Sequence, residues 1–290
     1  KEDLSWPQKL NELVPVGNSP MNSSNLPYYS IDTFISPQCG GNPTGVFLVG
    51  KFPGAAGMHR IAAGLDFLVT VFVEPGIKEH AAIRYFTATG EIPACGHATL
   101  AAAGLLLDQH PGSPVSFRTN AGVCITISMA DGVLYMAYPK YPLETVSLGN
   151  DMLNALKIAD YRYAGFCKEL ETLFIELPRA AILRTVDPDH RRLIKCSDTI
   201  KEVVITSVSD DPQYDFLLRS FCPWIGIDED PVTGSVHSVL VPYWMHRTGR
   251  QEMKAYQASE RGGEVFVRSL DDSVLIGGKI RISGYHGTEE

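Results

Sequence analysis

Alternation of polar and apolar residues predicts a series of short strands in the first half of the chain. Residues 28–34 read Tyr-Tyr-Ser-Ile-Asp-Thr-Phe, which is the pattern of a strand with one buried face, and the turn-forming stretch at 40–43 interrupts it. A short helix is predicted at 57–65. Further strands are predicted at 44–49, 69–73, 82–86, 115–119, 123–129 and 133–137.

Two apolar runs predict buried helices. Residues 96–107 are almost all small or apolar, so we expect a helix that is buried on all sides. The second run covers residues 238–244 and contains Pro242. Because proline lacks a backbone N–H and its ring clashes with the preceding turn, we expect Pro242 to kink this helix or to end it early.

The second half of the chain repeats the mixture of strands and helices less clearly, and prolines at 139–142 separate it from the first half. We therefore predict a flexible leader at 1–27, an N-terminal half at 28–143 and a C-terminal half at 144–290, whose last strand returns to the first half. Strands are predicted at 172–176, 203–207, 264–269, 273–277 and 279–283, and helices at 151–156 and 188–194.

An internal echo indicates that the two halves are related. Glu91-Ile-Pro-Ala-Cys-Gly-His-Ala leads into the first apolar helix, and Glu229-Asp-Pro-Val-Thr-Gly-Ser-Val leads into the second. Both segments read Glu-x-Pro-x-x-Gly and both lie where a loop enters an apolar helix. Self-similarity of this kind is typical of duplicated structure.

Composition and charge exclude several classes of protein. The chain has 290 residues, 44% of them hydrophobic and 20% charged, which is the composition of a globular protein with a sizeable core. The net charge is −8 and no basic cluster is present, so we expect no nucleic-acid partner. No apolar run approaches the roughly 20 residues of a membrane span. The six cysteines show no spacing typical of zinc, so we expect reduced thiols, a cytoplasmic location and no metal.

The two echoed loops are candidates for a small-molecule site. A helix N-terminus carries free N–H groups and about half a positive charge, which suits a carboxylate or another oxyanion. Gly96 and Gly234 would let a ligand approach the backbone closely. If the halves are related by a two-fold axis, we expect the two loops to face each other across the domain interface.

Groups able to move protons stand at both loops. His97 begins the first helix, where the helix dipole favours its neutral form. Asp230 and Ser235 occupy corresponding positions in the second loop. The alternative is that Asp230 and Ser235 cap the second helix and that His97 only packs in the interior. The sequence leaves both interpretations open.

For three further residues, a role at the substrate site is weighed against a structural role. Cys95 stands at a helix N-terminus, but the second loop has no matching thiol, which disfavours a two-cysteine racemase. His237 is expected to face the core or the interface more readily than a ligand. Arg261, in an Arg-Gly-Gly turn, either meets an anion or belongs to a solvated loop.

The chain resembles the phenazine-biosynthesis PhzF-like family from about Tyr28 to Gly287. The resemblance rests on Asp32-Thr-Phe, Gly41-Asn42-Pro43, the two echoed segments and Gln257-Ala-Ser-Glu-Arg-Gly-Gly, in this order. It implies an α+β fold like that of diaminopimelate epimerase, with two similar halves that each wrap a mixed, mostly antiparallel sheet around an apolar helix.

The resemblance also implies isomerisation by proton transfer without a cofactor. The family's histidine, aspartate and serine match His97, Asp230 and Ser235. The family's glutamate, within Asn-Leu-Ser-Glu-Thr-x-Phe-Val, aligns with Val69, which cannot accept a proton. Asp66, three residues away, is expected on another face.

These observations predict an isomerase or cyclase of secondary metabolism that acts on a small molecule. His97, Asp230 and Ser235 are the candidate catalytic residues. A non-catalytic relative that binds a metabolite or a protein is the alternative, and a homodimer is left open. The candidate substrate-binding residues are Asn42, Val69, Cys95, Gly96, Gly234 and Arg261.

Overall fold

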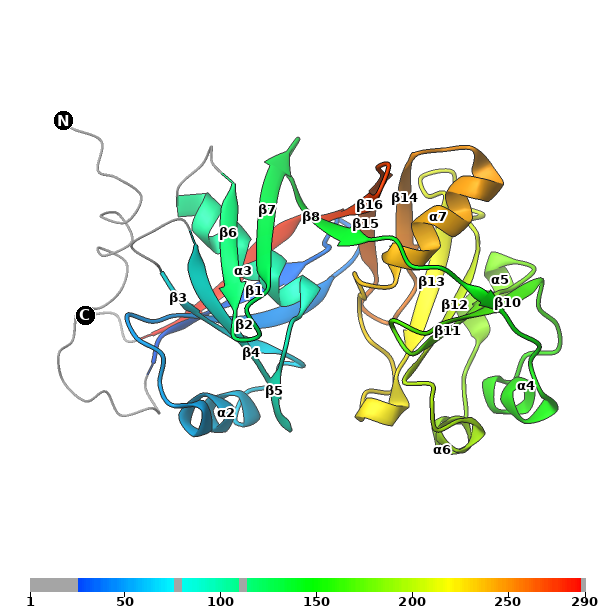
Figure 1. Cartoon of the computed structure of the whole chain (residues 1–290), viewed down its shortest axis with the longest axis horizontal. Coiled ribbons are helices and arrows are strands. Elements are labelled where there is room, and N and C mark those ends of the chain that lie inside the picture. The colour runs from blue at the N-terminus through cyan, green and yellow to red at the C-terminus, as the bar shows by residue number, and fades with distance from the viewer. Residues whose placement is uncertain (1–25, 76–79, 110–113, 288–290) are drawn as a thin grey trace. The chain divides into compact units, whose positions relative to one another are not determined.

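The computed structural model describes residues 26–75, 80–109 and 114–287, which divide into two compact units (Figure 1). Unit 1 comprises Lys1–Thr33, Asn42–Met136 and Gly278–Glu290, as far as these segments are described, and unit 2 comprises Phe34–Gly41 and Ala137–Gly277. Each unit is therefore assembled from separated stretches of sequence. The predicted leader at 1–27 lies almost entirely outside the described residues.

Unit 1 is a mixed sheet with two helices. Strand β1 lies between β17 and β2, and both neighbours run antiparallel to it. The sheet continues from β2 through β3, β4 and β6 to β7 and β8, and β5 forms a short hairpin with β4. The strands are β1 (Tyr28–Thr33), β2 (Asn42–Leu48), β3 (Thr70–Glu74), β4 (Ala81–Thr87), β5 (Gly90–Ile92), β6 (Val115–Thr119), β7 (Cys124–Ala130), β8 (Val133–Pro139) and β17 (Ile280–His286). The helices are α2 (Ala55–Ala63) and α3 (Gly96–Gln109).

Helix α3 is the core of unit 1. Its residues from Ala98 to Leu107 are buried on every side, as the apolar run predicts. It contacts β1, β2, β3, β6 and β17. At Gly104 an added side chain would collide with Ile280 of β17, so this glycine allows the last strand to lie close to the helix.

Helix α2 covers the other face of the same sheet. Phe47, Phe72 and Phe86 form an aromatic cluster with Met58 and Ala62 of the helix, and the rings of Phe47 and Phe72 stack at 4.7 Å. Since residues alternate between the two faces of a strand, the neighbours of these phenylalanines face α3.

Unit 2 is also a mixed sheet. Its order is β9–β10–β11–β12–β13–β14–β15–β16. The strands are β9 (Glu144–Thr145), β10 (Tyr163–Cys167), β11 (Thr172–Glu176), β12 (Glu202–Val208), β13 (Phe216–Phe221), β14 (Glu252–Gln257), β15 (Gly263–Ser269) and β16 (Ser273–Gly278). The helices are α4 (Asn150–Leu156), α5 (Ala180–Thr185), α6 (His190–Leu193) and α7 (His237–Thr248), with short 3-10 turns at Ile194–Cys196 and Pro223–Ile225.

Helix α7 packs on one face of this sheet. The Trp244 ring is buried, stacks on Phe216 at 5.6 Å and donates a 3.0 Å hydrogen bond from Nε1 to Thr206. The opposite face holds a separate apolar cluster, in which Leu156, Leu183 and other residues of α4, α5 and α6 cover the sheet.

The expectation that Pro242 ends the second helix early is wrong. Helix α7 continues to Thr248 with Pro242 inside it. Proline provides no N–H for the carbonyl of Ser238, four residues earlier, and this carbonyl accepts a 3.2 Å hydrogen bond from the backbone of Tyr141. The partner that the helix cannot supply therefore comes from a neighbouring segment.

The two units have the same strand order and directions. From β1 to β8 the successive pairings, with β6 next to β4, are antiparallel, parallel, antiparallel, parallel, antiparallel and antiparallel. From β10 to β16 the pairings follow the identical order. The apolar helix α3 or α7 comes at the same point, before the fifth strand of each series. This repetition confirms an α+β fold with two related halves.

The sequence pattern missed several elements of unit 2. Strands β10, β13 and β14 and helix α5 were not predicted. In β13, Phe-Leu-Leu-Arg-Ser-Phe is covered on both faces, so it shows no alternation of polar and apolar residues. In β14 the buried residues do alternate with more exposed ones, but Glu252, Lys254 and Gln257 make the segment too polar to be recognised as a strand.

Candidate functional site

The start of α3 gathers three predicted site residues of unit 1. His97 is 8% exposed, and its Nδ1 lies 3.4 Å from Asn42 Nδ2 and 3.4 Å from Cys95 Sγ. Asn42 is fully buried at the first position of β2. The first N–H groups of the helix have no partner within it. A buried imidazole and a helix N-terminus therefore stand together.

The contact with Asn42 orients the His97 ring and, with the amide nitrogen facing it, favours one tautomer. An amide nitrogen donates hydrogen bonds and cannot accept them, so Nδ1 of the ring is the acceptor. A neutral imidazole then carries its hydrogen on Nε2. In this arrangement His97 can donate a hydrogen bond or a proton from Nε2.

Val69 lies just before β3 on the face of the sheet that packs against α3. It is 6% exposed. Gly45 pairs with Thr70, so the register extended by one residue places Val69 beside Thr44, whose buried hydroxyl has no hydrogen-bond partner among the described residues. On the other side Thr70 pairs with Phe86, which places Val69 opposite Thr87. Asp66 is exposed and provides no buried carboxylate at this position.

The start of α7 is organised by hydrogen bonds to the loop that precedes it. Asp230 Oδ2 accepts a 2.5 Å bond from Thr233 Oγ1, and the Asp230 backbone N–H donates to Ser220 O at 3.0 Å. Helix α7 has no side-chain cap at its N-cap residue, Val236. The half-buried Ser235 hydroxyl makes no hydrogen bond in the described part of the chain. Capping therefore does not account for Ser235.

Gln257 holds the loop that carries Asp230, and sequence reasoning did not single it out. Its Nε2 donates to Asp230 O at 2.7 Å, and its Oε1 accepts from Thr233 N at 2.8 Å. Ser259 adds a 2.7 Å bond from Oγ to Pro231 O. Both residues belong to the Gln-Ala-Ser-Glu-Arg-Gly-Gly segment. The sequence motif shared with the family thus includes Gln257 and Ser259, but the motif by itself does not indicate that they hold the Asp230 loop.

The glycine pair that ends this segment allows the same loop to pack closely. Gly262 has a φ of 64°, which favours glycine. A Cβ at Gly263 would collide with Val232, which is fully buried in the Asp230 loop, and would approach Phe34 O. Gly263 therefore allows close packing against the loop that carries Asp230, and Gly262 allows the turn that precedes it.

We expect Gly263→Ala to lower the free energy of unfolding by about 1–3 kcal/mol, because it overpacks the contact with Val232. Urea unfolding followed by circular dichroism measures this. Gly149→Ala is the matched control, since that glycine has an ordinary φ of −74° and open space around it. Equal losses in the two variants would contradict the role of Gly263.

Arg261 is engaged with backbone carbonyls. Its Nε donates to Gly41 O at 2.8 Å and its Nη2 donates to Gly40 O at 3.0 Å. The side chain thus ties its turn to the 34–41 segment of unit 2. A role for Arg261 in binding an anion stays a prediction.

His237 is fully buried at the start of α7. Its Nδ1 lies 3.1 Å from Gly234 O, which can only accept, so the ring hydrogen is on Nδ1. Burial lowers the pKa of His237 to about 4. The ring is therefore a neutral part of the core, as the sequence-based interpretation favours. At Gly234 itself an added Cβ would make only ordinary contacts.

The glutamate of each echoed segment has a structural partner. Arg84 holds Glu91 through two hydrogen bonds of 2.8 and 2.7 Å, and Arg219 holds Glu229 through two of 2.7 and 2.8 Å. The Arg84 guanidinium lowers the pKa of Glu91. Each arginine also lies over a phenylalanine two residues further on, Phe86 or Phe221. The echo thus extends to an Arg-x-Phe sequence on the preceding strand.

The structure brings the predicted residues together in two groups. Asn42, Cys95 and His97 form the group of unit 1, and Asp230, Gly234 and Ser235 lie along one short segment of unit 2. The expectation that both groups act on one ligand stays a prediction.

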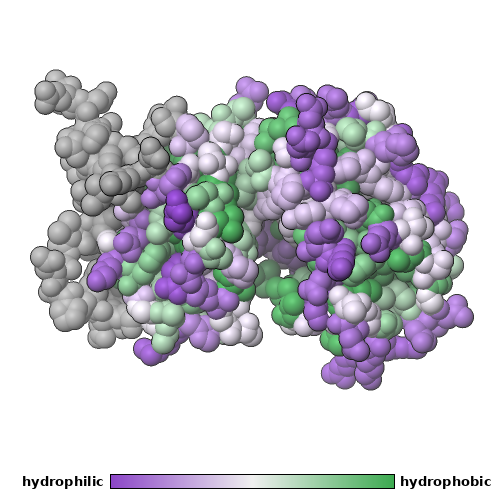
Figure 2. Space-filling model, viewed as in Figure 1, coloured by the Kyte–Doolittle hydropathy of each residue, from purple (hydrophilic) through white to green (hydrophobic). Residues whose placement is uncertain are grey.

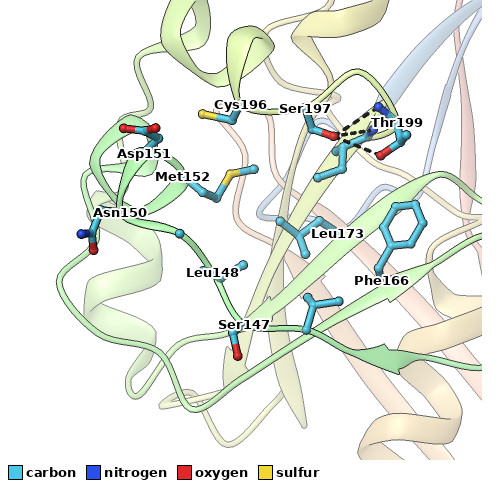
Figure 3. Close-up of a pocket in the computed structure, with 13 residues that line it drawn as sticks. Ser147, Leu148, Asn150, Asp151, Met152, Phe166, Leu173, Cys196, Ser197 and Thr199 are labelled. Atoms are coloured by element: carbon cyan, nitrogen blue, oxygen red, sulfur yellow. Dashed lines mark hydrogen bonds between the residues drawn. The ribbon is translucent and has the colours of Figure 1, made fainter.

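A separate hollow in unit 2 contains none of the predicted residues. It has a volume of about 730 Å³ and lies between the start of α4 and the 196–200 loop (Figure 3). Leu148, Met152 and Leu173 provide apolar walls. The Ser197 hydroxyl accepts bonds from the backbone of Thr199 and Ile200 at its rim, so it already has a role in the local turn.

No helix in the described residues is long and apolar enough to cross a membrane. Hydrophilic residues cover much of the visible face of unit 2 and alternate with smaller apolar areas (Figure 2).

Comparison with known proteins gives consistent matches over most of the chain. A sequence profile described as phenazine biosynthesis-like protein matches residues 31–283. A protein named an uncharacterized isomerase from Halalkalibacterium halodurans is 32% identical over 257 residues, which make up 87% of this chain and 94% of the relative. Another with the same description from Pseudomonas aeruginosa is 33% identical over 258 residues, or 87% of this chain and 94% of the relative.

A solved structure matches at the level of the fold and the sequence. The crystal structure of a phenazine biosynthesis protein of the PhzF family from Enterococcus faecalis superposes with a TM-score of 0.83 at 28% identity. The match covers 92% of this chain and 100% of that protein.

Proposed function

Because the chain belongs to the phenazine biosynthesis-like protein family, we propose that it is a cofactor-free isomerase or cyclase that acts on a small metabolite of secondary metabolism. The names of its relatives support isomerase-type chemistry. In this proposal His97, Asp230 and Ser235 act on the substrate, and Asn42, Val69, Cys95, Gly96, Gly234 and Arg261 bind it.

The observation that carries the proposal is the state of His97. A nearly buried neutral imidazole, oriented by Asn42 at the N-terminus of a helix, is suited to general acid–base work near neutral pH. Its Nε2 donates to an oxygen of the substrate, and the N–H groups at the start of α3 stabilise negative charge on that oxygen.

In this proposal, no proton is abstracted from the substrate at the position of Val69. A valine offers apolar surface and no proton acceptor. An unsaturated substrate held against this surface is folded for ring closure, and positioning alone can supply several kcal/mol of the barrier. A non-catalytic metabolite- or protein-binding relative is the second candidate, because Val69 stands where the family has its glutamate.

We expect His97→Ala and Asp230→Asn each to reduce turnover by about 10²-fold or more, as the loss of a group that acts on the substrate does. Unsaturated and cyclic carboxylic acids, incubated with the protein and followed by proton NMR, are the test substrates. His59→Ala and Asp228→Asn are matched controls. His59, on α2, forms a hydrogen bond with the carbonyl of Ala88, and Asp228 is exposed. Turnover that survives in both site variants would overturn the assignment, and binding without turnover would favour the second candidate.

The same reaction in heavy water tests the consequence of Val69. We expect little solvent deuterium in the product, because ring closure by positioning moves no proton to or from the solvent. Rapid incorporation by the natural protein would instead mean that another residue supplies a base, with His97 and Asp230 the first to test.

A further inference from the structure

Unit 2 has a carboxyl group at the position that Val69 occupies in unit 1. Thr70 pairs with Phe86 across β3 and β4, and Val203 pairs with Phe221 across β12 and β13. Phe86 and Phe221 correspond, because each follows an arginine bound to the glutamate of an echoed loop. The residue before Thr70 is Val69. The residue before Val203 is Glu202.

Among the described residues, the partners of the Glu202 carboxyl are two hydroxyl groups. Its Oε1 accepts from Ser220 Oγ, and its Oε2 lies 3.0 Å from Thr172 Oγ1. Both partners are fully buried. In the described part of the chain no lysine or arginine forms an ion pair with Glu202. A carboxylate without a cation in such surroundings is costly.

A count of hydrogens shows which form of Glu202 fits. Thr172 Oγ1 lies within hydrogen-bond distance of two oxygens, Leu170 O at 2.9 Å and Glu202 Oε2 at 3.0 Å. A hydroxyl has one hydrogen and cannot donate to both. Both contacts are satisfied when Glu202 carries a proton on Oε2 and donates it to Thr172, whose own hydrogen goes to Leu170.

Glu202 is linked to Asp230 through Ser220. The Ser220 side chain binds the Glu202 carboxyl, and its carbonyl accepts a 3.0 Å bond from the Asp230 backbone. Burial, followed by the negative charge of Asp230, raises the pKa of Glu202 to about 7. Other titratable groups on this face are the thiols of Cys222, just after β13, and of Cys167, opposite Thr172, the carboxyl group of Glu176 and the imidazole of His237. Glu229, next to Asp230, is paired with Arg219.

We propose that Glu202 is a positioning residue for Asp230: in its neutral form it donates to Thr172 and adds no further negative charge next to Asp230. Ionisation of Glu202 breaks the Glu202–Thr172–Leu170 chain and adds a second negative charge next to Asp230. The structural part of this proposal stands without an assigned activity. Its consequence for turnover rests on the function proposed above.

Infrared difference spectroscopy of the full chain tests the neutral state directly. We expect the C=O band of a protonated carboxylic acid at about pH 5 and its loss at about pH 9, given the direction of the pKa shift. Ordinary carboxyl groups are also partly protonated at about pH 5, so the band of Glu202 is the part of the natural protein's band that Glu202→Gln lacks. Identical bands in the two proteins would overturn the proposal.

Unfolding equilibria provide a second measurement. Glutamine keeps a donor towards Thr172, so Glu202→Gln imitates the neutral acid. The pKa of Glu202 is higher in the folded state than in the unfolded state. The contribution of Glu202 to the free energy of unfolding is therefore complete below the unfolded-state pKa and is lost as pH rises from about 4.5 to about 7. As pH rises across this window, the folding equilibrium constant of Glu202→Gln should increase at least roughly tenfold relative to that of the natural protein. Above the window the ratio of the two constants should stay constant. A difference that does not change with pH would contradict the proposal.

Glu176→Gln is the matched control. Glu176 is 1% exposed, whereas Glu202 is partly buried. Arg247 lies 2.7 Å from Glu176 Oε2, so glutamine there removes an ion pair and should destabilise the protein. With a substrate in hand, kcat of the natural protein should fall as Glu202 ionises while kcat of Glu202→Gln does not, with KM little changed. Equal pH profiles in the two proteins would remove the role towards Asp230, whereas a lack of any turnover would remove only the proposed function.

Discussion

Trp244→Ala is expected to lower the free energy of unfolding by about 3–5 kcal/mol. Trp244 is 1% exposed and its ring stacks on Phe216 in the middle of unit 2. Alanine leaves a cavity between α7 and the sheet and removes the hydrogen bond to Thr206. Since α7 carries the segment next to Asp230 and Ser235, the loss of packing also loosens the candidate site.

Urea unfolding monitored by circular dichroism measures the effect. Trp224→Ala is the matched control, because Trp224 is half-buried and bonds to the carbonyls of Ile194 and Ser197 at the edge of unit 2. If Trp244→Ala does not fold, Trp244→Phe keeps the comparison, with an expected loss of about 1–3 kcal/mol from a smaller ring and one lost bond. A loss no larger than that of Trp224→Ala would contradict the packing described for α7.

Val69→Glu is expected to make the stability of the protein strongly dependent on pH. The new carboxyl would replace a side chain that is 6% exposed, with Thr44 and Thr87 at the neighbouring register positions. Burial raises the pKa of such a group, so the variant is most stable where the carboxyl is protonated. Stability is lost as pH rises from the ordinary glutamate value towards the raised one, by about 2–4 kcal/mol at neutral pH and above.

Thermal and urea unfolding at about pH 4.5 and about pH 8 distinguish the effect of ionising the new carboxyl from the effect of the larger side chain. Val69→Gln has the same volume and no charge, so it should show no additional dependence on pH. If Val69→Glu and Val69→Gln respond alike to pH, the position is not the buried site that the structure indicates. Loss of affinity for an apolar ligand should accompany the charged variant alone.

Local pattern was sufficient for the central helix and for much of the sheet of unit 1. The helix at 96–107 is recognisable because every position is buried, and strands such as β3 are short apolar runs between turn residues. The echo between the two loops placed His97 and Asp230 at the starts of corresponding helices. These features depend on neighbours in sequence, which a single chain displays directly.

Contacts that join distant segments were not predictable in the same way. Asn42 lies beside His97 because β2 passes the start of α3, and Gln257 reaches the Asp230 loop from β14. Glu202 looks like an ordinary polar residue at the beginning of a strand. Only the register of β11, β12 and β13 places it between two buried hydroxyls. Such a partner set is a property of the tertiary structure.

The order in which the chain is synthesised matters for a protein built this way. Strand β1 leaves the ribosome long before its antiparallel neighbour β17, about 250 residues further along the chain. Unit 2 requires nothing beyond residue 277 and can form its hydrophobic core earlier. Throughout this interval β1 has an unpaired edge and α3 lacks the contact of Gly104 with Ile280. Unit 1 of the nascent chain therefore remains open to mispairing until β17 has been synthesised.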